Sequence, residues 1–196
     1  MKFGSIRLLP QFFLFLAILL MIIPVRWLLC WLTAAGLHEI FHLIALKICG
    51  YPIRSVSVGA FGVKIDTDTD RGIKGVFCAL AGPLAGFILL LFVRRIPMIA
   101  LCGLFQSVAN LVPVYPLDGG RALNNLLYLI FPDHRADLIT RYIERGIWFI
   151  LFVICVYGVV KLNLGVIPVS AIMMLYIRKK YLANTGVKRY NMSNRI

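Results

Sequence analysis

Six apolar stretches, the last of them short, limit the folds that are open to this chain. They cover residues 8–24, 27–49, 75–93, 96–112, 143–160 and 164–177. A helix that crosses a bilayer needs about 20 mainly apolar residues. Hydrophobic residues make up 61% of the chain and charged residues 15%, whereas a soluble domain is about half apolar and about a quarter charged. We therefore expect an all-α membrane protein with about six transmembrane helices.

The basic residues predict how these helices are oriented. Loops on the cytoplasmic side of a membrane carry an excess of lysine and arginine. If the N-terminus is cytoplasmic, most of the 21 basic residues fall inside, and the exceptions are Arg26, Arg94, Arg95 and Lys161. The distribution of basic residues across the membrane thus accounts for the net charge of +13, and we expect no nucleic-acid partner. The prediction is a multi-pass protein of the cell membrane, in contact with the lipid bilayer and with both termini in the cytoplasm.

The second apolar stretch contains the sequence His38-Glu39-Ile-Phe-His42. Residues four apart lie on one face of a helix, so both imidazoles can bind the same metal ion while Glu39 stands beside it. Ionisable groups at membrane depth are costly and are usually functional. This combination predicts a buried metal site.

A second polar motif ends the fourth apolar stretch, at Asn110-Leu-Val-Pro113-Val-Tyr-Pro116-Leu-Asp118-Gly-Gly-Arg121. Proline cannot continue a helix and Asp-Gly favours a turn, so we expect Asp118 on irregular backbone near the cytoplasmic end of that stretch. Asp118 can be a simple turn former. A two-histidine site nevertheless needs a third ligand, and Asp118 is the best-placed carboxylate.

Two other ionisable residues fit ordinary roles better. Glu144 stands among arginines at the start of the fifth stretch, where we expect an exposed charge at a helix end. His134 lies in a polar segment, where we expect a solvated histidine, although it can be an accessory ligand.

Two apolar segments suggest how the site is supported. Residues 53–66 alternate apolar and polar residues around central glycines, which predicts a small β-hairpin between the second and third helices. The hairpin is either a loop cover or an edge that holds an unwound peptide by strand addition. In the third stretch Ala81, Gly82, Ala85 and Gly86 form a face that can pack closely against the histidine-bearing helix.

These motifs resemble those of the site-2 protease family of intramembrane metalloproteases. The resemblance implies Zn²⁺ held by His38, His42 and Asp118, with Glu39 as catalytic base. Asn110 and Pro116 also match the second motif of that family, and we expect them at the substrate. The amide of Asn110 can stabilise the developing oxyanion or hold the substrate backbone. At Gly86 relatives often have asparagine instead.

The motif layout is most similar to the small branch of that family without a PDZ domain, which includes the sporulation stage IV factor B protease. The resemblance implies an endopeptidase that cuts a membrane protein near the cytoplasmic face. Its substrate would be a transcription-factor precursor or an anti-sigma type protein, and inhibitory or regulatory membrane partners are possible.

We expect a single domain over residues 1–196, with a catalytic core at about 27–123 and a basic cytoplasmic tail at 178–196. A metal-ion transporter remains an alternative, because intramembrane ionisable groups also mark ion pathways. The absence of an evident inverted repeat in the sequence counts against it.

Overall fold

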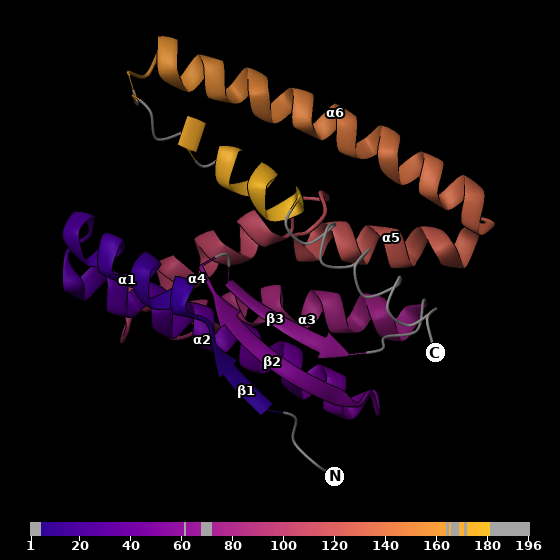
Figure 1. The fold of residues 1–196 in the computed structure, drawn as a ribbon, viewed down its shortest axis with the longest axis horizontal. Coiled ribbons are helices and arrows are strands. Elements are labelled where there is room, and N and C mark those ends of the chain that lie inside the picture. The colour runs from indigo at the N-terminus through magenta and orange to yellow at the C-terminus, as the bar shows by residue number, and fades with distance from the viewer. Residues whose placement is uncertain are drawn as a thin grey trace.

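The computed structural model describes residues 5–60, 62–67, 72–163, 165, 169–170 and 172–180, and it combines helices with one small sheet (Figure 1). The elements follow in the order β1 (Ser5–Leu8), α1 (Pro10–Ile22), α2 (Val25–Ile48), β2 (Ile53–Gly59), β3 (Gly62–Thr67), α3 (Ile73–Leu90), α4 (Pro97–Asn110), α5 (Asp118–Ile130) and α6 (Asp133–Val160). Residues 172–180 are also helical, and most of the predicted basic tail lies outside the described residues.

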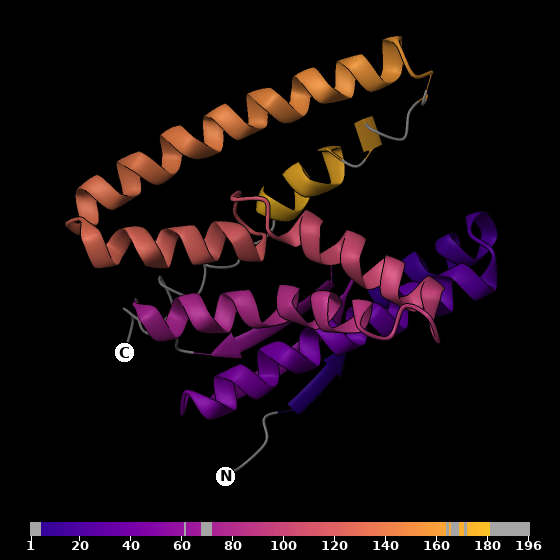
Figure 2. The ribbon, with the colours of Figure 1, turned by 180° about the vertical axis from the view of Figure 1, so that it is seen from behind.

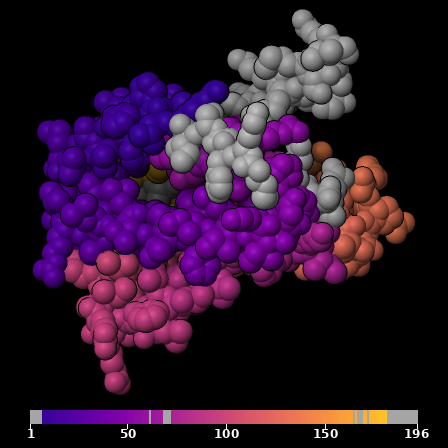
Figure 3. Space-filling view, turned by 90° about the horizontal axis from the view of Figure 1, so that it is seen from below, coloured from indigo at the N-terminus to yellow at the C-terminus, as the bar shows by residue number. Residues whose placement is uncertain are grey.

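Helix α3 is the centre of the molecule. It packs against α2, α4 and α5, while α6 packs against α5. In both ribbon views α6 runs along the outer side, and the yellow helix of residues 172–180 lies between α6 and the rest of the molecule (Figures 1 and 2). The surface is hollowed between α1 and α2, and yellow atoms of that C-terminal helix are visible at the bottom of the hollow (Figure 3).

Proline residues place several helix starts. Pro10 and Pro97 occupy the first turn of α1 and α4, where the missing N–H group is not needed and the fixed φ suits a helix. Pro132 directly precedes α6. The same chemistry that interrupts the apolar stretches therefore fixes where their helices begin.

Three described helices are long and apolar enough to cross a membrane, namely α2, α3 and α6. Helices α1 and α4 are apolar but shorter, with 13 and 14 residues. The apolar stretch at 96–112 gives only the shorter α4, because Pro97 begins the helix and it ends at Asn110. The count of six transmembrane helices thus stays a prediction, and part of the sixth stretch lies outside the described residues.

The sheet has one strand more than the sequence suggested. Strands β2 and β3 form an antiparallel hairpin between α2 and α3, in which Gly59 pairs with Gly62. Strand β1 adds to the other side of β2 in parallel, with Ser5 opposite Ser55. The strand order β1-β2-β3 makes β2 the central strand, so the described edges are β1 and β3.

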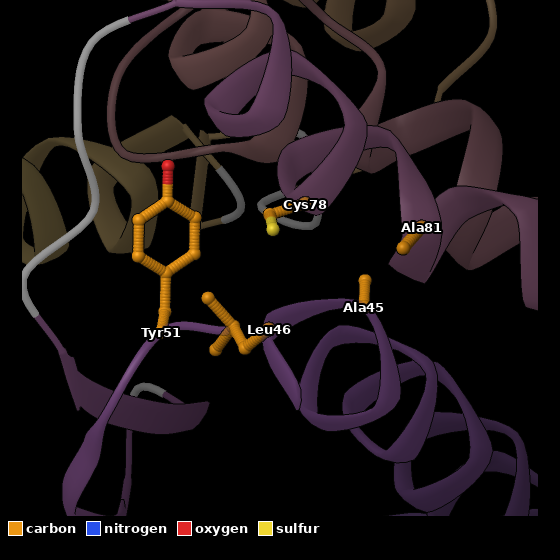
Figure 4. Close-up of a cluster of buried hydrophobic side chains, with 5 residues drawn as sticks. All are labelled: Ala45, Leu46, Tyr51, Cys78 and Ala81. Atoms are coloured by element: carbon orange, nitrogen blue, oxygen red, sulfur yellow. The ribbon is translucent and has the colours of Figure 1, made fainter. Parts of the chain in front are cut away.

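The two buried clusters of the core are rich in small side chains. One joins the end of α2 to the start of α3 and consists of Ala45, Leu46, Tyr51, Cys78 and Ala81 (Figure 4). The other contains Ala34, Leu89, Ala100 and Cys102, from α2, α3 and α4. Alanine and cysteine at these contacts let the helices approach closely.

Helices α3 and α4 meet at two glycines. A Cβ atom on Gly86 would lie 2.1 Å from the Oγ atom of Ser107 and 2.2 Å from the carbonyl oxygen of Gly103. One on Gly103 would lie 2.7 Å from the side chain of Leu89. There is thus no room at Gly86 for the asparagine of the family pattern.

This contact predicts the effect of adding one methyl group. Gly86→Ala would collide with backbone atoms of α4, and overpacking of this kind costs about 1–3 kcal/mol. Gly146→Ala in α6 is a matched control, because nothing lies within 4 Å of its Cβ position. We expect a lower midpoint of thermal unfolding in detergent for Gly86→Ala and an equal or higher one for the control. Equal midpoints for Gly86→Ala and wild type would contradict this packing.

Candidate metal centre

Helix α2 presents both histidines on its buried face. Ala34, His38, His42 and Leu46 recur every four residues and are all buried, which places them along one side of the helix. His38 is 4% exposed and His42 is 8% exposed. Two imidazole groups therefore point into the protein interior from adjacent turns.

Asp118 reaches the histidines from α5, and its backbone differs from the sequence prediction. It is not on irregular backbone but is the first residue of α5, with Gly119 and Gly120 inside the helix. A Cβ atom on Gly119 would lie 2.1 Å from the carbonyl oxygen of Leu111, and one on Gly120 would lie 2.4 Å from the carbonyl carbon of Val114. The glycines thus serve close packing of the helix start against the preceding loop rather than a turn.

Three side-chain atoms converge at the meeting point of α2 and α5. The Nε2 atom of His38 lies 2.9 Å from the Oδ2 atom of Asp118, and the Nε2 atom of His42 lies 3.2 Å from that same oxygen. The two Nε2 atoms are 3.2 Å apart. All three residues are buried, and among the described residues they form the one group with the spacing of a metal site.

The hydrogen bond that His42 makes through Nδ1 directs its other ring nitrogen, Nε2, toward the position that a metal ion would occupy. The Nδ1 atom of His42 lies 2.8 Å from the carbonyl oxygen of Cys78, so Nδ1 carries the proton and donates it to that oxygen. In a neutral imidazole the Nε2 atom then has only a lone pair. This lone pair faces the carboxylate of Asp118, an arrangement that a metal ion stabilises directly.

The distances fit zinc. Ligand atoms about 2.0–2.1 Å from a tetrahedral Zn²⁺ ion lie about 3.3–3.4 Å from one another. The observed spacings of 2.9 to 3.2 Å need only a small expansion to reach this geometry. Two histidines and one carboxylate leave a fourth coordination position open, as in catalytic zinc sites. The cluster is therefore consistent with Zn²⁺.

The acid–base state of Asp118 agrees with a ligand role. Asp118 stands on α5, outside the helices that are long enough to cross a membrane. Burial alone would raise the pKa of its carboxyl group, but the contacts with His38 and His42 outweigh burial and hold this pKa well below its usual range. The carboxylate is thus available in its charged form.

Helix α3 holds the histidines in place through Gly82. A Cβ atom on Gly82 would lie 2.1 Å from the Nε2 atom of His42 and 2.6 Å from the Nε2 atom of His38. The backbone of α3 therefore lies directly against the edge of the two rings that faces the metal position. This contact explains why the sequence has glycine here, on the face that the sequence analysis assigned to helix packing.

Glu39 is half-buried and stands next to His38 on α2. Its carboxylate interacts electrostatically with both histidines, with Asp118 and with Arg178 of the C-terminal helix. Glu39 therefore lies at the metal cluster without being a member of it. This is the position that a proton-transferring group needs, and its catalytic role stays a prediction.

Asn110, Pro116 and His134 are the other residues for which the sequence suggested a role at the site. Asn110 is the last residue of α4 and is partly buried, and Pro116 is buried in the loop that leads to Asp118. Their predicted roles in substrate binding stay predictions. His134 is exposed at the start of α6 and is not part of the metal cluster.

Glu144 differs from its expected role as an exposed charge. Its side chain is 13% exposed, and its Oε1 atom accepts a hydrogen bond of 2.9 Å from the backbone N–H of Tyr115. Its Oε2 atom forms an ion pair of 2.5 Å with Lys179. Glu144 thus connects the loop before Asp118 to the C-terminal helix. Sequence reasoning missed this because the two partners are 29 and 35 residues away.

Comparison with known proteins gives the site a context. The structure is similar to the solved structure of the site-2 protease from Methanocaldococcus jannaschii, with a TM-score of 0.68 and 21% sequence identity over 92% of this chain and 91% of that chain. The chain therefore has the fold of a site-2 protease, and the resemblance that the motifs indicated is confirmed at the level of the fold.

A curated relative agrees with this fold. A protein of Synechocystis sp. named "putative zinc metalloprotease" is 24% identical over an alignment of 188 positions, which covers 84% of this chain and 48% of the relative. The chain thus spans about half the length of this relative. No protein-family model matches the chain.

The contact at Gly82 predicts how zinc binding responds to a single methyl group. Gly82→Ala would push both imidazoles away from Asp118, and we expect zinc affinity to fall roughly 10- to 100-fold, as for other changes to groups that orient ligands. The control is Gly36→Ala on α2, where nothing lies within 4 Å of the Cβ position. Metal content and affinity are measured by mass spectrometry and competition with a chelator. Unchanged affinity in Gly82→Ala would refute this positioning role.

The ion pair between Glu144 and Lys179 predicts that substitutions of these two residues have coupled effects. We expect Glu144→Gln and Lys179→Met each to increase trypsin cleavage after Lys180, because each releases the C-terminal helix. The double variant should be hardly worse than either single one, giving a coupling energy of about 1 kcal/mol. Arg141→Gln, at an exposed position of the same helix α6, is the control. Strictly additive effects would show that the two side chains act independently.

Proposed function

We propose that this protein is a zinc-dependent intramembrane endopeptidase of the site-2 protease type. The observation that carries the proposal is the buried triangle of His38, His42 and Asp118, with Glu39 beside it on a helix long enough to cross a membrane. The fold and the curated relative support the same activity.

The chain's own residues divide the work of peptide hydrolysis. His38, His42 and Asp118 would hold a zinc ion, which would supply a Lewis acid to polarise the substrate carbonyl and to lower the pKa of a water molecule to about 7. The carboxylate of Glu39 accepts a proton from this water as its oxygen attacks the carbonyl carbon. Glu39 then delivers the proton to the amine nitrogen when the C–N bond breaks. The two histidines stay in place throughout, because α3 packs against them at Gly82.

The sheet is where we expect the unwound segment of the substrate to bind. A transmembrane helix encloses its own peptide bonds, so it must unwind locally before hydrolysis. Strand addition is one of the two roles that the sequence of this hairpin suggests. Because β2 is already paired on both sides, a further strand would have to pair with an edge strand. We propose that unwound substrate pairs with β3, through the backbone groups that β3 does not use toward β2.

The proposal extends to the surroundings of the enzyme. We propose a multi-pass protein of the cell membrane, with both termini and the active site toward the cytoplasm. The substrate is a membrane protein, and regulated cleavage of a transcription-factor precursor or an anti-sigma type protein stays a prediction from the resemblance. The same holds for the small branch without a PDZ domain and for regulatory membrane partners.

The decisive experiment compares wild type with Glu39→Gln on a membrane-anchored reporter in proteoliposomes. We expect cleavage to fall at least 100-fold in Glu39→Gln, the lower range for loss of a general acid–base, while zinc content stays unchanged. The control is Asp137→Asn, which removes a carboxylate at an exposed position of α6 outside the cluster and should retain far more activity.

Two results would contradict the proposal. Full cleavage by Glu39→Gln would show that another group moves the proton. Zinc flux into vesicles by wild type, with no hydrolysis of any reporter, would instead support the metal-ion transporter.

A further inference from the structure

A cationic cleft lies beside the metal centre, and nothing in the proposed reaction uses it. Its lining includes Arg121 of α5 and Arg178 of the C-terminal helix, together with Lys64 of β3. The rest of the lining comes mainly from small residues around the β2–β3 turn and from the start of α1. Three basic side chains from separate parts of the chain thus meet at one end of the sheet.

The two arginines are close to each other and to the active site. Arg121 is three residues after Asp118, hence about 4.5 Å further along the axis of α5. Arg178 is repelled by Arg121 and attracted by Asp118 and Glu39. Within the described part of the chain, no hydrogen bond or ion pair joins either guanidinium group to an acidic side chain. The cleft therefore has a surplus of positive charge.

The position of Arg178 is built into the structure. Its Nη2 atom would lie 3.7 Å from a Cβ atom on Gly62, so the guanidinium group rests against the beginning of β3. The next residue, Lys179, is held by Glu144, which also binds the loop before Asp118. The C-terminal helix thus brings Arg178 to the sheet by a specific contact rather than as a solvated surface charge.

From this geometry we infer that the cleft of Arg121 and Arg178 binds an acidic side chain of the substrate, close to the bond that is cut. Guanidinium groups bind carboxylates through paired, charge-assisted hydrogen bonds. A carboxylate between the two arginines would relieve their mutual repulsion. A peptide paired with β3 would pass Lys64 and Gly62, which line this cleft.

This inference rests on the proposed function, which it deepens by naming a substrate preference. A substrate with aspartate or glutamate at the matching position would be chosen over one with the neutral amide. A lipid phosphate has similar charge, but the cleft lies next to the catalytic carboxylate and the hairpin, where peptide has to pass. We therefore assign the cleft to peptide.

The first test measures binding without hydrolysis, in the full-length Glu39→Gln protein loaded with zinc in neutral phosphatidylcholine nanodiscs. The probes are fluorescein-labelled peptides of alanine, leucine and serine that carry a single aspartate, moved along the peptide one position at a time. Each peptide has an asparagine counterpart. We expect one register in which aspartate binds about tenfold more tightly, as for a charge-assisted hydrogen bond.

Variants in the same background assign the preference to the cleft. Arg178→Gln and Arg121→Gln should each bring the aspartate-to-asparagine ratio close to one, and Arg178→Glu should favour a lysine peptide instead. Arg135→Gln, at an exposed position of α6, should keep the preference of the parent protein. Reversal by Arg178→Glu cannot be explained by misfolding, because a damaged protein would lose binding of every peptide.

Several results would contradict the proposal that the cleft binds an acidic side chain of the substrate. These are equal affinity for aspartate and asparagine peptides at every position, no measurable binding of either, or a preference that survives both arginine substitutions. Loss of the preference when anionic phosphatidylglycerol is added would assign the cleft to lipid headgroups. Because binding is measured without turnover, a wild-type protein that cleaves no reporter refutes the proposed function while leaving this test intact.

Discussion

The close contact between α3 and α2 at Gly82 is the constraint on which the rest of the site depends. Three ligand atoms have to stay within about 0.5 Å of their binding positions, although Asp118 is 76 and 80 residues away from the two histidines in the chain. Gly82 lets the backbone of α3 touch both imidazole rings, and α3 also packs on α5, which carries Asp118. One helix without a side chain at this point therefore fixes all three ligands.

The same principle of close backbone approach recurs around the site. Gly86 and Gly103 bring α4 against α3, and Gly119 and Gly120 bring the start of α5 against the loop before it. In a membrane, apolar side chains gain little by leaving lipid for protein, so helices associate through tight packing and polar contacts. Small residues at these crossings supply the packing. The hydrogen bond from His42 to Cys78 and the bridge through Glu144 supply polar contacts.

Sequence reasoning was reliable where a pattern is local. The spacing of His38 and His42 shows that both face one side of a helix, and the alternation after residue 53 indicates a hairpin. It was wrong where distant parts of the chain decide the local structure. Asp118 starts a helix instead of a turn because the loop before it packs over Gly119 and Gly120, and Glu144 is a bridge instead of a solvated charge. Strand β1 forms only because β2 offers it an edge.

The amino-acid sequence by itself predicted a membrane protein with two histidines on one face of a helix, since hydropathy and helical periodicity depend on neighbouring residues alone. It also named Asp118 as the third ligand, but by elimination and resemblance rather than by geometry. Only the tertiary structure decided that Asp118 meets the histidines, that Gly82 supports them, and that Arg178 lies beside Glu39. These facts are contacts between helices far apart in the chain, and the packing of whole helices sets them.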